Sequence, residues 1–424
     1  MIFRIPIVSV AAGFAVLVIG SVAAESNPMV ASMPALAGDG VTDDTVAIQA
    51  RLDSGAACVV LPTPKKAYVI SRTLKIGSNQ ELRLDRFSMI RLADGSNCPM
   101  LENRAYRGGR DGRLAVTGGI WDMNSLGQGP NPWHDPGLKE KIPKRHDPDF
   151  FIGIALRFNN VDDMSVRGLT IRNPVLYGLA FCQASNVTVD DIAFDYRVWR
   201  TKPLNLDGIH LDGCCRHFRI TNLRGTCYDD MVALNANDEI CAPTEGSISD
   251  VDIDGLYCDY GHSAVRLLSA GSDVRRVTVR NVHGRFYCYT IGLTHYFPDN
   301  PRGRFDDIVI SDVFASKAIA PDGIDCAYRR EMPLIQIEGP VDVGNLSVAR
   351  VYRDEDAVGS PTIGLTAGMS SIESLSVRDC RMKNRLKEPI VFIQGRNLIA
   401  NCVEENNTFI GAWERGCWFW NVFD

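Results

Sequence analysis

The sequence has 424 residues, of which 45% are hydrophobic and 23% are charged, values typical of a soluble globular protein. The formal net charge of -6 argues against a general nucleic-acid binder, which would present a positive surface. The length suits one large domain or several small ones, although repeat folds do not follow that rule.

The first 24 residues have the features of a secretory signal peptide. Arg4 precedes an apolar run from Ile5 to Gly20, and Val22-Ala23-Ala24 has the small residues of a cleavage site. We therefore predict a signal peptide over residues 1–24, one domain over residues 25–424, and a secreted or periplasmic mature chain without a membrane span. An uncleaved membrane anchor is the alternative, because the apolar run is nearly long enough to cross a bilayer.

Thirteen cysteines are scattered along the chain, and no two of them form a C-x-x-C pair. An odd number cannot all pair within one chain, and the spacing does not fit a zinc ribbon. We expect most of them to be small buried apolar residues, with one or two disulfides left open.

A glycine-rich turn at residues 38–45, Gly-Asp-Gly-Val-Thr-Asp-Asp-Thr, leads into a short amphipathic helix. Thr42 is the expected N-cap, and the two aspartates that follow it favour the positive end of the helix dipole. Ile48 and Leu52 share one face, so the helix should cover an open end of the fold. This opening resembles that of secreted pectate-lyase-superfamily proteins, and the resemblance implies a parallel β-helix that begins with a capping helix.

Two families of short apolar strands alternate from about residue 150. Successive members of the first family are separated by 23 residues (Val166 to Val189) to 38 residues (Ile310 to Val348). Such a period indicates a solenoid, and two strand families in each period indicate a parallel β-helix. The predicted fold class is therefore all-β: a right-handed parallel β-helix, a single-stranded solenoid of about ten coils, with a short N-terminal capping helix.

Long loops interrupt the repeats at residues 125–150, 195–206 and 296–305 and carry basic and aromatic side chains. Loops on a solenoid build its binding surface, and these residue types suit stacking on sugars and holding carboxylates. Plain solvated loops are the alternative. We predict substrate contacts for Asn205, His210, Arg266, Trp199, Arg200, Lys202 and His295.

Three carboxylates and an imidazole stand at the entrances of successive strands of the second family, which has the pattern apolar-x-apolar. They are Asp207, Asp229, Asp230 and His262, before the strands at 209–211, 232–234 and 265–267. Stacked coils are about 4.8 Å apart, so these side chains should converge. Clustered carboxylates push one another's pKa apart, which lets one act as an acid and another as a base, as glycoside hydrolysis requires.

These residues resemble the motifs of glycoside hydrolase family 28, the polygalacturonase family. That family carries Asn-x-Asp-Gly, Asp-Asp, Gly-His-Gly and Arg-Ile-Lys on successive coils. Asn205-Leu206-Asp207-Gly208, Asp229-Asp230 and Gly261-His262-Ser263 match the first three in order. The resemblance implies that Asp229 is the general acid, that Asp207 and Asp230 activate water, that His262 supports the acid, and that the anomeric centre is inverted.

The fourth motif is missing. Alignment by strand places Gly292 and Thr294 where the family has the arginine and lysine that grip the galacturonate carboxylate. We therefore predict that unsubstituted polygalacturonate is a poor substrate. Either Arg266, His295 or a basic loop compensates, or the substrate is neutral or differently linked, as in rhamnogalacturonan or other plant or algal polymers.

The sequence thus predicts a secreted glycoside hydrolase that cleaves a pectin-like or rhamnogalacturonan-like polysaccharide or oligosaccharide by an inverting acid–base mechanism. We expect a monomer that uses no cofactor and no metal and binds no nucleic acid. Two other classes stay open. One is a polysaccharide lyase or uronate epimerase on the same fold, with Ca²⁺ at the acidic cluster. The other is a β-helix that binds glycan without cleaving it.

Overall fold

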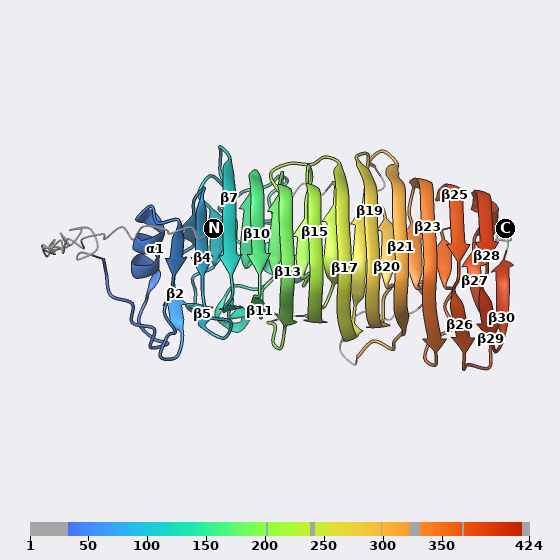
Figure 1. The fold of residues 1–424 in the computed structure, drawn as a ribbon, viewed down its shortest axis with the longest axis horizontal. Helices are drawn as coiled ribbons and strands as arrows, with labels where there is room; N and C mark the ends of the chain where they lie inside the picture. The colour runs from blue at the N-terminus through green and yellow to red at the C-terminus, as the bar shows by residue number, and fades with distance from the viewer. Residues whose placement is uncertain are drawn as a thin grey trace, which may run out of the picture.

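Stacked coils form an elongated solenoid in the computed structural model, which describes residues 33–200, 202–237, 242–297, 299–321, 331–366 and 369–417. The chain runs from helix α1 (Thr45–Asp53) at one end to strand β30 (Trp413–Cys417) at the other (Figure 1). Within these ranges, two parallel sheets of eighteen and twelve strands, here called sheet A and sheet B, extend along the stack. The predicted class, an all-β right-handed parallel β-helix, is confirmed.

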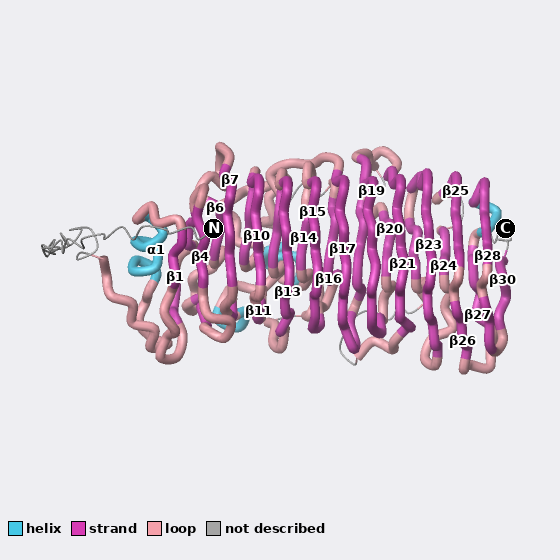
Figure 2. Tube along the Cα trace, in the orientation of Figure 1, coloured by secondary structure: helices cyan, strands magenta, loops and turns pink. Residues whose placement is uncertain are grey.

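Sheet A contains the longer strands, several of which span most of one side of a coil (Figure 2). Its members are β1 (Cys58–Val60), β2 (Tyr68–Ile70), β4 (Gln80–Arg83), β5 (Met89–Leu92), β7 (Asp111–Thr117), β8 (Ile120–Asp122), β10 (Val161–Arg167), β11 (Thr170–Arg172), β13 (Ser185–Asp195), β15 (Arg216–Thr226), β17 (Ile248–Gly261), β19 (Asp273–Phe286), β21 (Gly303–Lys317), β23 (Val341–Glu355), β25 (Ser371–Arg378), β26 (Arg381–Asn384), β28 (Ile399–Glu405) and β29 (Thr408–Ile410).

Sheet B contains short strands, one from each coil. Its members are β3 (Leu74–Ile76), β6 (Leu101–Asn103), β9 (Leu156–Asn159), β12 (Leu179–Cys182), β14 (Ile209–Leu211), β16 (Asp230–Asn235), β18 (Ser263–Leu268), β20 (Ile291–Thr294), β22 (Ile335–Glu338), β24 (Ile363–Leu365), β27 (Ile390–Gln394) and β30. The twelve strands in the described part of the chain exceed the ten coils expected.

The long strands of sheet A bend at one column of left-handed residues. Asn222 (φ 57°), Gly255 (φ 85°), Asn281 (φ 56°) and Asp312 (φ 55°) occupy it on successive coils. Glycine, asparagine and aspartate tolerate this conformation better than other residues. The bend explains why two apolar residues three positions apart recur in the first strand family, because each flanks the turn and faces inward.

In sheet B the apolar-x-apolar strands stack in register. Ile209 pairs with Val232 and Val232 with Val265, while their outward neighbours His210, Ala233 and Arg266 form a second column. The inward side chains are completely buried and join one core along the stack. The sequence pattern therefore fixes which residues of sheet B face away from the core.

Helix α1 covers the N-terminal end of the solenoid, as predicted (Figure 2). The prediction that Thr42 is its N-cap is wrong, because the helix begins at Thr45 and Asp44 holds that position. Asp44 instead accepts hydrogen bonds from the backbone N–H groups of Ala37 (2.6 Å) and Gly38 (3.1 Å) and so ties down the preceding turn. Short helices also occur in the loops: η1 (Ser125–Gly127), η2 (Pro132–His134), α2 (Pro136–Lys139) and η4 (Arg396–Leu398).

The ten cysteines whose side chains the structure describes are free thiols, and Cys182, Cys258, Cys288 and Cys380 are buried, as expected of small apolar residues. Over the described ranges no helix is long and apolar enough to cross a membrane. The predicted signal peptide lies outside the described residues. The domain limits at residues 25 and 424 stay a prediction.

Adjacent residues in β21 offer a test of the inward face. Ile310 is completely buried, whereas Val309 is 38% exposed. Ile310→Ala should lower the free energy of unfolding by about 2–5 kcal/mol, because it leaves a cavity in a packed core. Val309→Ala, the matched control, should change it by only about 0.5 kcal/mol. Denaturant unfolding measures both, and equal effects would contradict the assignment.

Candidate active site

The candidate site lies where the chain turns from sheet A into sheet B. Strand β17 ends at Gly261 and β18 begins at Ser263, so His262 occupies the corner itself. Asp229 and Asp230 occupy the same corner one coil earlier, at the start of β16. The backbone N–H of Asp230 donates to Oδ1 of Asp207 (3.1 Å), which joins the preceding coil to the group. Parallel stacking thus brings the four predicted catalytic side chains together.

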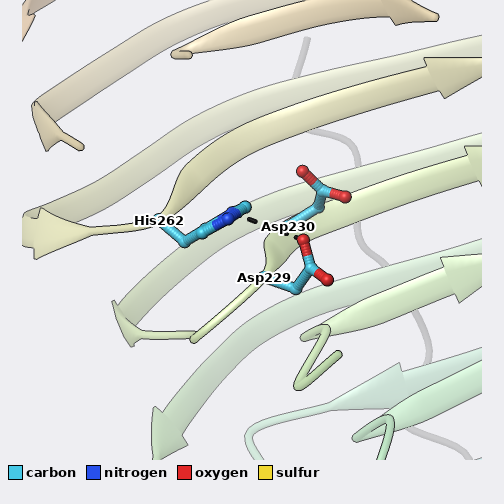
Figure 3. A group of neighbouring side chains, drawn as sticks. All are labelled: Asp229, Asp230 and His262. Carbon is cyan, nitrogen blue, oxygen red and sulfur yellow. Dashed lines mark ion pairs between the residues drawn. The ribbon is translucent and has the colours of Figure 1, made fainter. Parts of the chain in front are cut away.

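Asp229, Asp230 and His262 form the centre of the group, each offering an oxygen or nitrogen within 4.8 Å of the others (Figure 3). Nδ1 of His262 lies 3.3 Å from Oδ1 of Asp229 and 2.6 Å from the hydroxyl of Ser263. Asp230 and His262 are completely buried, whereas Asp229 keeps 8% exposure. Asp229 is therefore the carboxylate of this trio nearest to solvent.

Arg266 supplies positive charge to the group. It projects outward from β18, keeps 14% of its side chain exposed, and places Nε 3.1 Å from Oδ2 of Asp230. Its Nη2 lies 3.9 Å from Oδ2 of Asp207. Burial raises the pKa of Asp230, and the guanidinium opposes that rise by favouring the ionised carboxylate.

Asp207 is completely buried and has the clearest pKa shift of the group. Burial is the main cause, and together with the negative charges of Asp229 and Asp230 it raises the pKa to about 7 against the opposing contact of His210. The aspartates therefore differ in environment, which is the condition for separate acid and base roles.

Two carboxylates and an imidazole could in principle hold a divalent ion. The guanidinium of Arg266 already lies against Asp230, so the negative charge of that carboxylate is already offset. A second cation there would meet like charge. The donor set therefore fits a metal poorly, and we assign no metal to it.

Apart from Arg266, which lies in the cluster itself, the predicted substrate-contact residues fall into two groups. The first group lies in the loop before β14 and consists of Trp199, Arg200, Lys202 and Asn205, of which Arg200 and Lys202 are exposed. The centroid of the Trp199 ring is 4.9 Å from that of Tyr228, which is next to Asp229 in the sequence. The second group, His210 and His295, is buried. The ring nitrogens of His295 contact the carbonyl of Pro301 (2.8 Å) and the N–H of Phe297 (3.2 Å), so this side chain organises its own loop.

Tyr289 belongs to the site but was missed by the sequence reasoning. Its hydroxyl lies 3.4 Å from Oδ1 of Asp230. A Cβ at Gly292 would lie 2.8 Å from the Tyr289 ring, so glycine makes room for that ring. The signal was available, because Tyr289 precedes Ile291 by two positions, as Asp207 precedes Ile209 and Asp230 precedes Val232.

Residues 125–154, here called the cover segment, lie over the outer face of sheet B on the N-terminal side of the cluster. Trp133 and Phe150 pack on a satellite core that includes Ala180, the outward residue of β12 that is in register with His210. Nε2 of His134 lies 2.6 Å from Oδ1 of Asn205, which ties the segment to the loop before β14. Beyond the cluster in the other direction, Tyr296 and Phe297 are 43% and 37% exposed.

A cavity of about 710 Å³ lies elsewhere, with Asp273, Arg304 and Asn397 among its lining residues, and no residue of the cluster lines it. The cluster, in contrast, brings three aspartates, an imidazole and a guanidinium together at the strand entrances. The fold and the site thus define a parallel β-helix with a candidate acid–base centre.

The sequence profile of glycosyl hydrolases family 28 matches residues 113–285, a span that contains all four predicted catalytic residues. The resemblance to this family is confirmed, and it supports glycoside hydrolase activity in general terms. No curated protein matches the chain.

Several solved structures are similar to this chain over most of its length. They include the surface adhesin PfbA of Streptococcus pneumoniae, with 15% identity, coverage of 90% of each chain and a TM-score of 0.60. A Yersinia enterocolitica family 28 exopolygalacturonase has 13% identity, coverage of 89% of this chain and 76% of that chain, and a TM-score of 0.57. The A-module of an Azotobacter vinelandii mannuronan C-5 epimerase has 14% identity, coverage of 91% and 96%, and a TM-score of 0.58. At these identities the similarity shows the fold alone.

Replacement of Arg266 tests the electrostatics of the cluster. Without the guanidinium, the pKa values of Asp207 and Asp230 should rise further, so the folded state should hold protons that the unfolded chain releases above about pH 4. Stability should then decrease as pH rises from about 5 to about 8, and more steeply in Arg266→Gln than in the wild type. Thermal unfolding at several pH values measures this.

The control is Arg280→Gln, since Arg280 pairs with Asp252 and Asp254 on the surface of sheet A. Against the opposing effect of burial, hydrogen bonds from Asn281 and Arg280 lower the pKa of Asp254, so the contribution of Arg280 to stability is lost below about pH 4. The control should therefore follow the wild type above pH 5. Parallel curves for Arg266→Gln and the wild type would contradict the proposed charge balance.

Proposed function

We propose that this protein hydrolyses glycosidic bonds of a plant or algal polysaccharide, with Asp229 as general acid. The observation that carries the proposal is the convergence of Asp207, Asp229, Asp230 and His262 at neighbouring strand entrances. Glycoside hydrolysis needs one carboxyl that protonates the leaving oxygen and another that activates water. The family 28 profile over the same residues supports this assignment.

The environments of the carboxylates support a division of roles. Asp229 is the most exposed of the three and contacts His262, which suits a group that must reach the leaving oxygen. Asp207 and Asp230 share the guanidinium of Arg266, which favours the ionised form needed to take a proton from water. We propose inversion of the anomeric centre on the strength of the family resemblance.

The proposed substrate differs from plain polygalacturonate at the C-terminal side of the cluster. Gly292 lies under the Tyr289 ring, and Thr294 is completely buried with its hydroxyl donating to the carbonyl of Leu267 (3.2 Å). Neither residue can grip a carboxylate. We therefore propose a neutral or differently linked sugar at this position, in a pectin-like or rhamnogalacturonan-like polymer.

We also propose that the enzyme acts from a chain end. A polymer that crossed the cluster in both directions would need the outer face of β9 and β12, and the cover segment occupies that face. The exposed aromatic residues Tyr296 and Phe297 lie in the opposite direction and suit stacking on sugar rings. Substrate would then enter from the C-terminal side only.

A polysaccharide lyase or uronate epimerase is the second candidate. Arg266 and Tyr289 both lie against Asp230, and a cation beside a phenol is a pair that could neutralise a uronate and move a proton. The similar fold of the mannuronan C-5 epimerase module is compatible with it. A lyase would release an unsaturated product that absorbs ultraviolet light, whereas a hydrolase would release reducing ends without such absorbance.

A non-catalytic glycan-binding β-helix is a third candidate, and the similar fold of the adhesin is compatible with it. Such a protein would bind polymer without releasing reducing ends.

We propose export directed by residues 1–24 and action as a secreted or periplasmic monomer.

The catalytic assignment predicts the effect of three substitutions. Asp207→Asn, Asp229→Asn and Asp230→Asn keep the side-chain shape and remove the proton chemistry, so each should lower kcat by about 10²–10⁴-fold. A substrate with a good leaving group should restore much of the activity of Asp229→Asn only, because such a group needs little protonation. Near-full activity of all three variants on a confirmed substrate would refute the site.

Substrate preference is tested by comparing polymers. Polygalacturonate should be hydrolysed far more slowly than the best substrate in a panel of pectic and algal polysaccharides, measured as new reducing ends. Efficient turnover of polygalacturonate would show that another side chain binds the galacturonate carboxylate in place of the missing arginine and lysine.

Action from a chain end predicts how a polymer is shortened. Viscosity should fall slowly while reducing ends accumulate, and short products of one size should appear from the start. Trp133→Ala, which opens the satellite core under the cover segment, should increase the loss of viscosity per bond cleaved. A rapid early loss of viscosity with the wild type would contradict the proposal.

A further inference from the structure

His210 is the central residue of the short strand β14, and it faces away from the coil interior yet is completely buried. Its Nδ1 lies 2.7 Å from Oδ2 of Asp207. Its Nε2 lies 3.1 Å from Oδ1 of Asp212 and 3.0 Å from the side-chain amide of Asn235 on β16. The ring stacks on Tyr177 with centroids 4.0 Å apart and planes 13° from parallel. Contacts on both edges and one face therefore hold the imidazole.

The two carboxylates determine the protonation of the ring. An ionised carboxylate can only accept hydrogen bonds, so a carboxylate at each nitrogen requires both nitrogens to donate. An imidazole with two N–H groups is an imidazolium. Burial alone would lower the pKa of His210, but the charges and hydrogen bonds of Asp212 and Asp207 outweigh it and raise the pKa to about 10. The Asn235 amide can turn its oxygen toward Nε2 and accept as well.

We propose that Asp212 and His210 are positioning residues that fix Asp207 as an ionised base by means of a buried imidazolium. This proposal rests on the proposed hydrolase function, in which Asp207 helps to activate water. Asp212 holds the imidazolium, the imidazolium holds Asp207, and Arg266 faces Asp207 from β18 with Nη2 at 3.9 Å. Without a cation at 2.7 Å, Asp207 would have to ionise next to Asp229 and Asp230 with only the more distant guanidinium to offset their charge.

Other titratable groups around this chain of contacts do not compete for the proton. Two thiols, those of Cys182 and Cys215, lie close enough to Asp212 for its charge to affect them. They stay protonated because burial, with a smaller contribution from that charge, raises their pKa values well above the ordinary range. Tyr177 contributes its ring face. Asp229 and Asp230 act on Asp207 and oppose its ionisation, which is the effect that the imidazolium offsets.

The sequence carries this arrangement as His-x-Asp at 210–212. Residues two apart in a strand point to the same side, so Asp212 follows His210 on the outward face. Asn235 stands in register with Asp212 on the next coil, one position beyond the Leu211–Leu234 pair. The strand pattern thus places all three polar groups on the outward face of sheet B.

The test uses His210→Asn, whose side-chain amide can still donate to Asp207 from near the position of Nδ1 but carries no charge. Loss of an opposite charge at this distance should raise the pKa of Asp207, so the rising limb of the kcat–pH profile should move upward by about 1–3 pH units. At neutral pH kcat should fall while KM changes little. Asp212→Asn should move the limb in the same direction by a smaller amount.

His283→Asn is the matched control. His283 is also an imidazole stacked on an aromatic ring, with Tyr257 at 5.0 Å and Phe314 at 4.7 Å on its two faces, but it lies on the outer face of sheet A. This variant should keep the wild-type pH profile. If His210→Asn and Asp212→Asn fold and lose activity while the limb stays in place, their role is only structural and the proposal is wrong.

A second readout needs neither substrate nor variant folding. In protein labelled with ¹⁵N at histidine, the His210 ring should show two protonated nitrogens at about pH 8, where a free imidazole is neutral. A neutral His210 ring at that pH would overturn the proposal whatever the activity. An imidazolium at His210 together with no hydrolysis of any glycan would leave the arrangement standing and refute the proposed function instead.

Discussion

In-register stacking of parallel strands is the constraint on which this molecule depends. Each coil repeats the one before it at about 4.8 Å, so any position in a strand becomes a column along the solenoid. Inward columns of isoleucine, valine and leucine build the core, and an outward column carries His210, Ala233 and Arg266. The catalytic candidates are close together because they occupy two adjacent columns at one corner, although 55 positions separate Asp207 from His262.

The second feature of the site is a balance of buried charge. Three aspartates lie together with little access to water, an arrangement that would be costly if all were ionised without partners. Arg266 stands between Asp207 and Asp230, His210 holds the far side of Asp207, and His262 contacts Asp229. Each carboxylate therefore has its own cation or imidazole. This division gives chemically identical side chains different proton affinities.

Much of this could be predicted from the sequence, because strand alternation and coil period are local patterns. The pattern of the second strand family is enough to place Asp207, Asp230 and His262 at strand entrances. The reason for the bend in sheet A was also present as a recurring asparagine, aspartate or glycine, such as Asn222 and Gly255, although it was not recognised.

What the sequence could not supply were contacts between coils and loops. His210 faces outward and was expected to meet substrate, but it is enclosed by Tyr177, by the aspartates on either side of β14, and by Asn235 on β16. Packing of the cover segment on Ala180 depends on Trp133 and Phe150, which no strand periodicity connects to sheet B. Tyr289 was overlooked because an aromatic residue before a strand has the same pattern as ordinary core.

We propose that the cluster adds water across a glycosidic bond with inversion. The most direct measurement follows the first turnover of an accepted glycan in ¹⁸O-labelled water, with product anomers resolved by NMR and the label located by mass spectrometry. We expect one ¹⁸O at the new anomeric carbon and an initial product whose anomeric configuration is opposite to that of the bond cleaved. An unlabelled unsaturated product, or a labelled product of retained configuration, would contradict it.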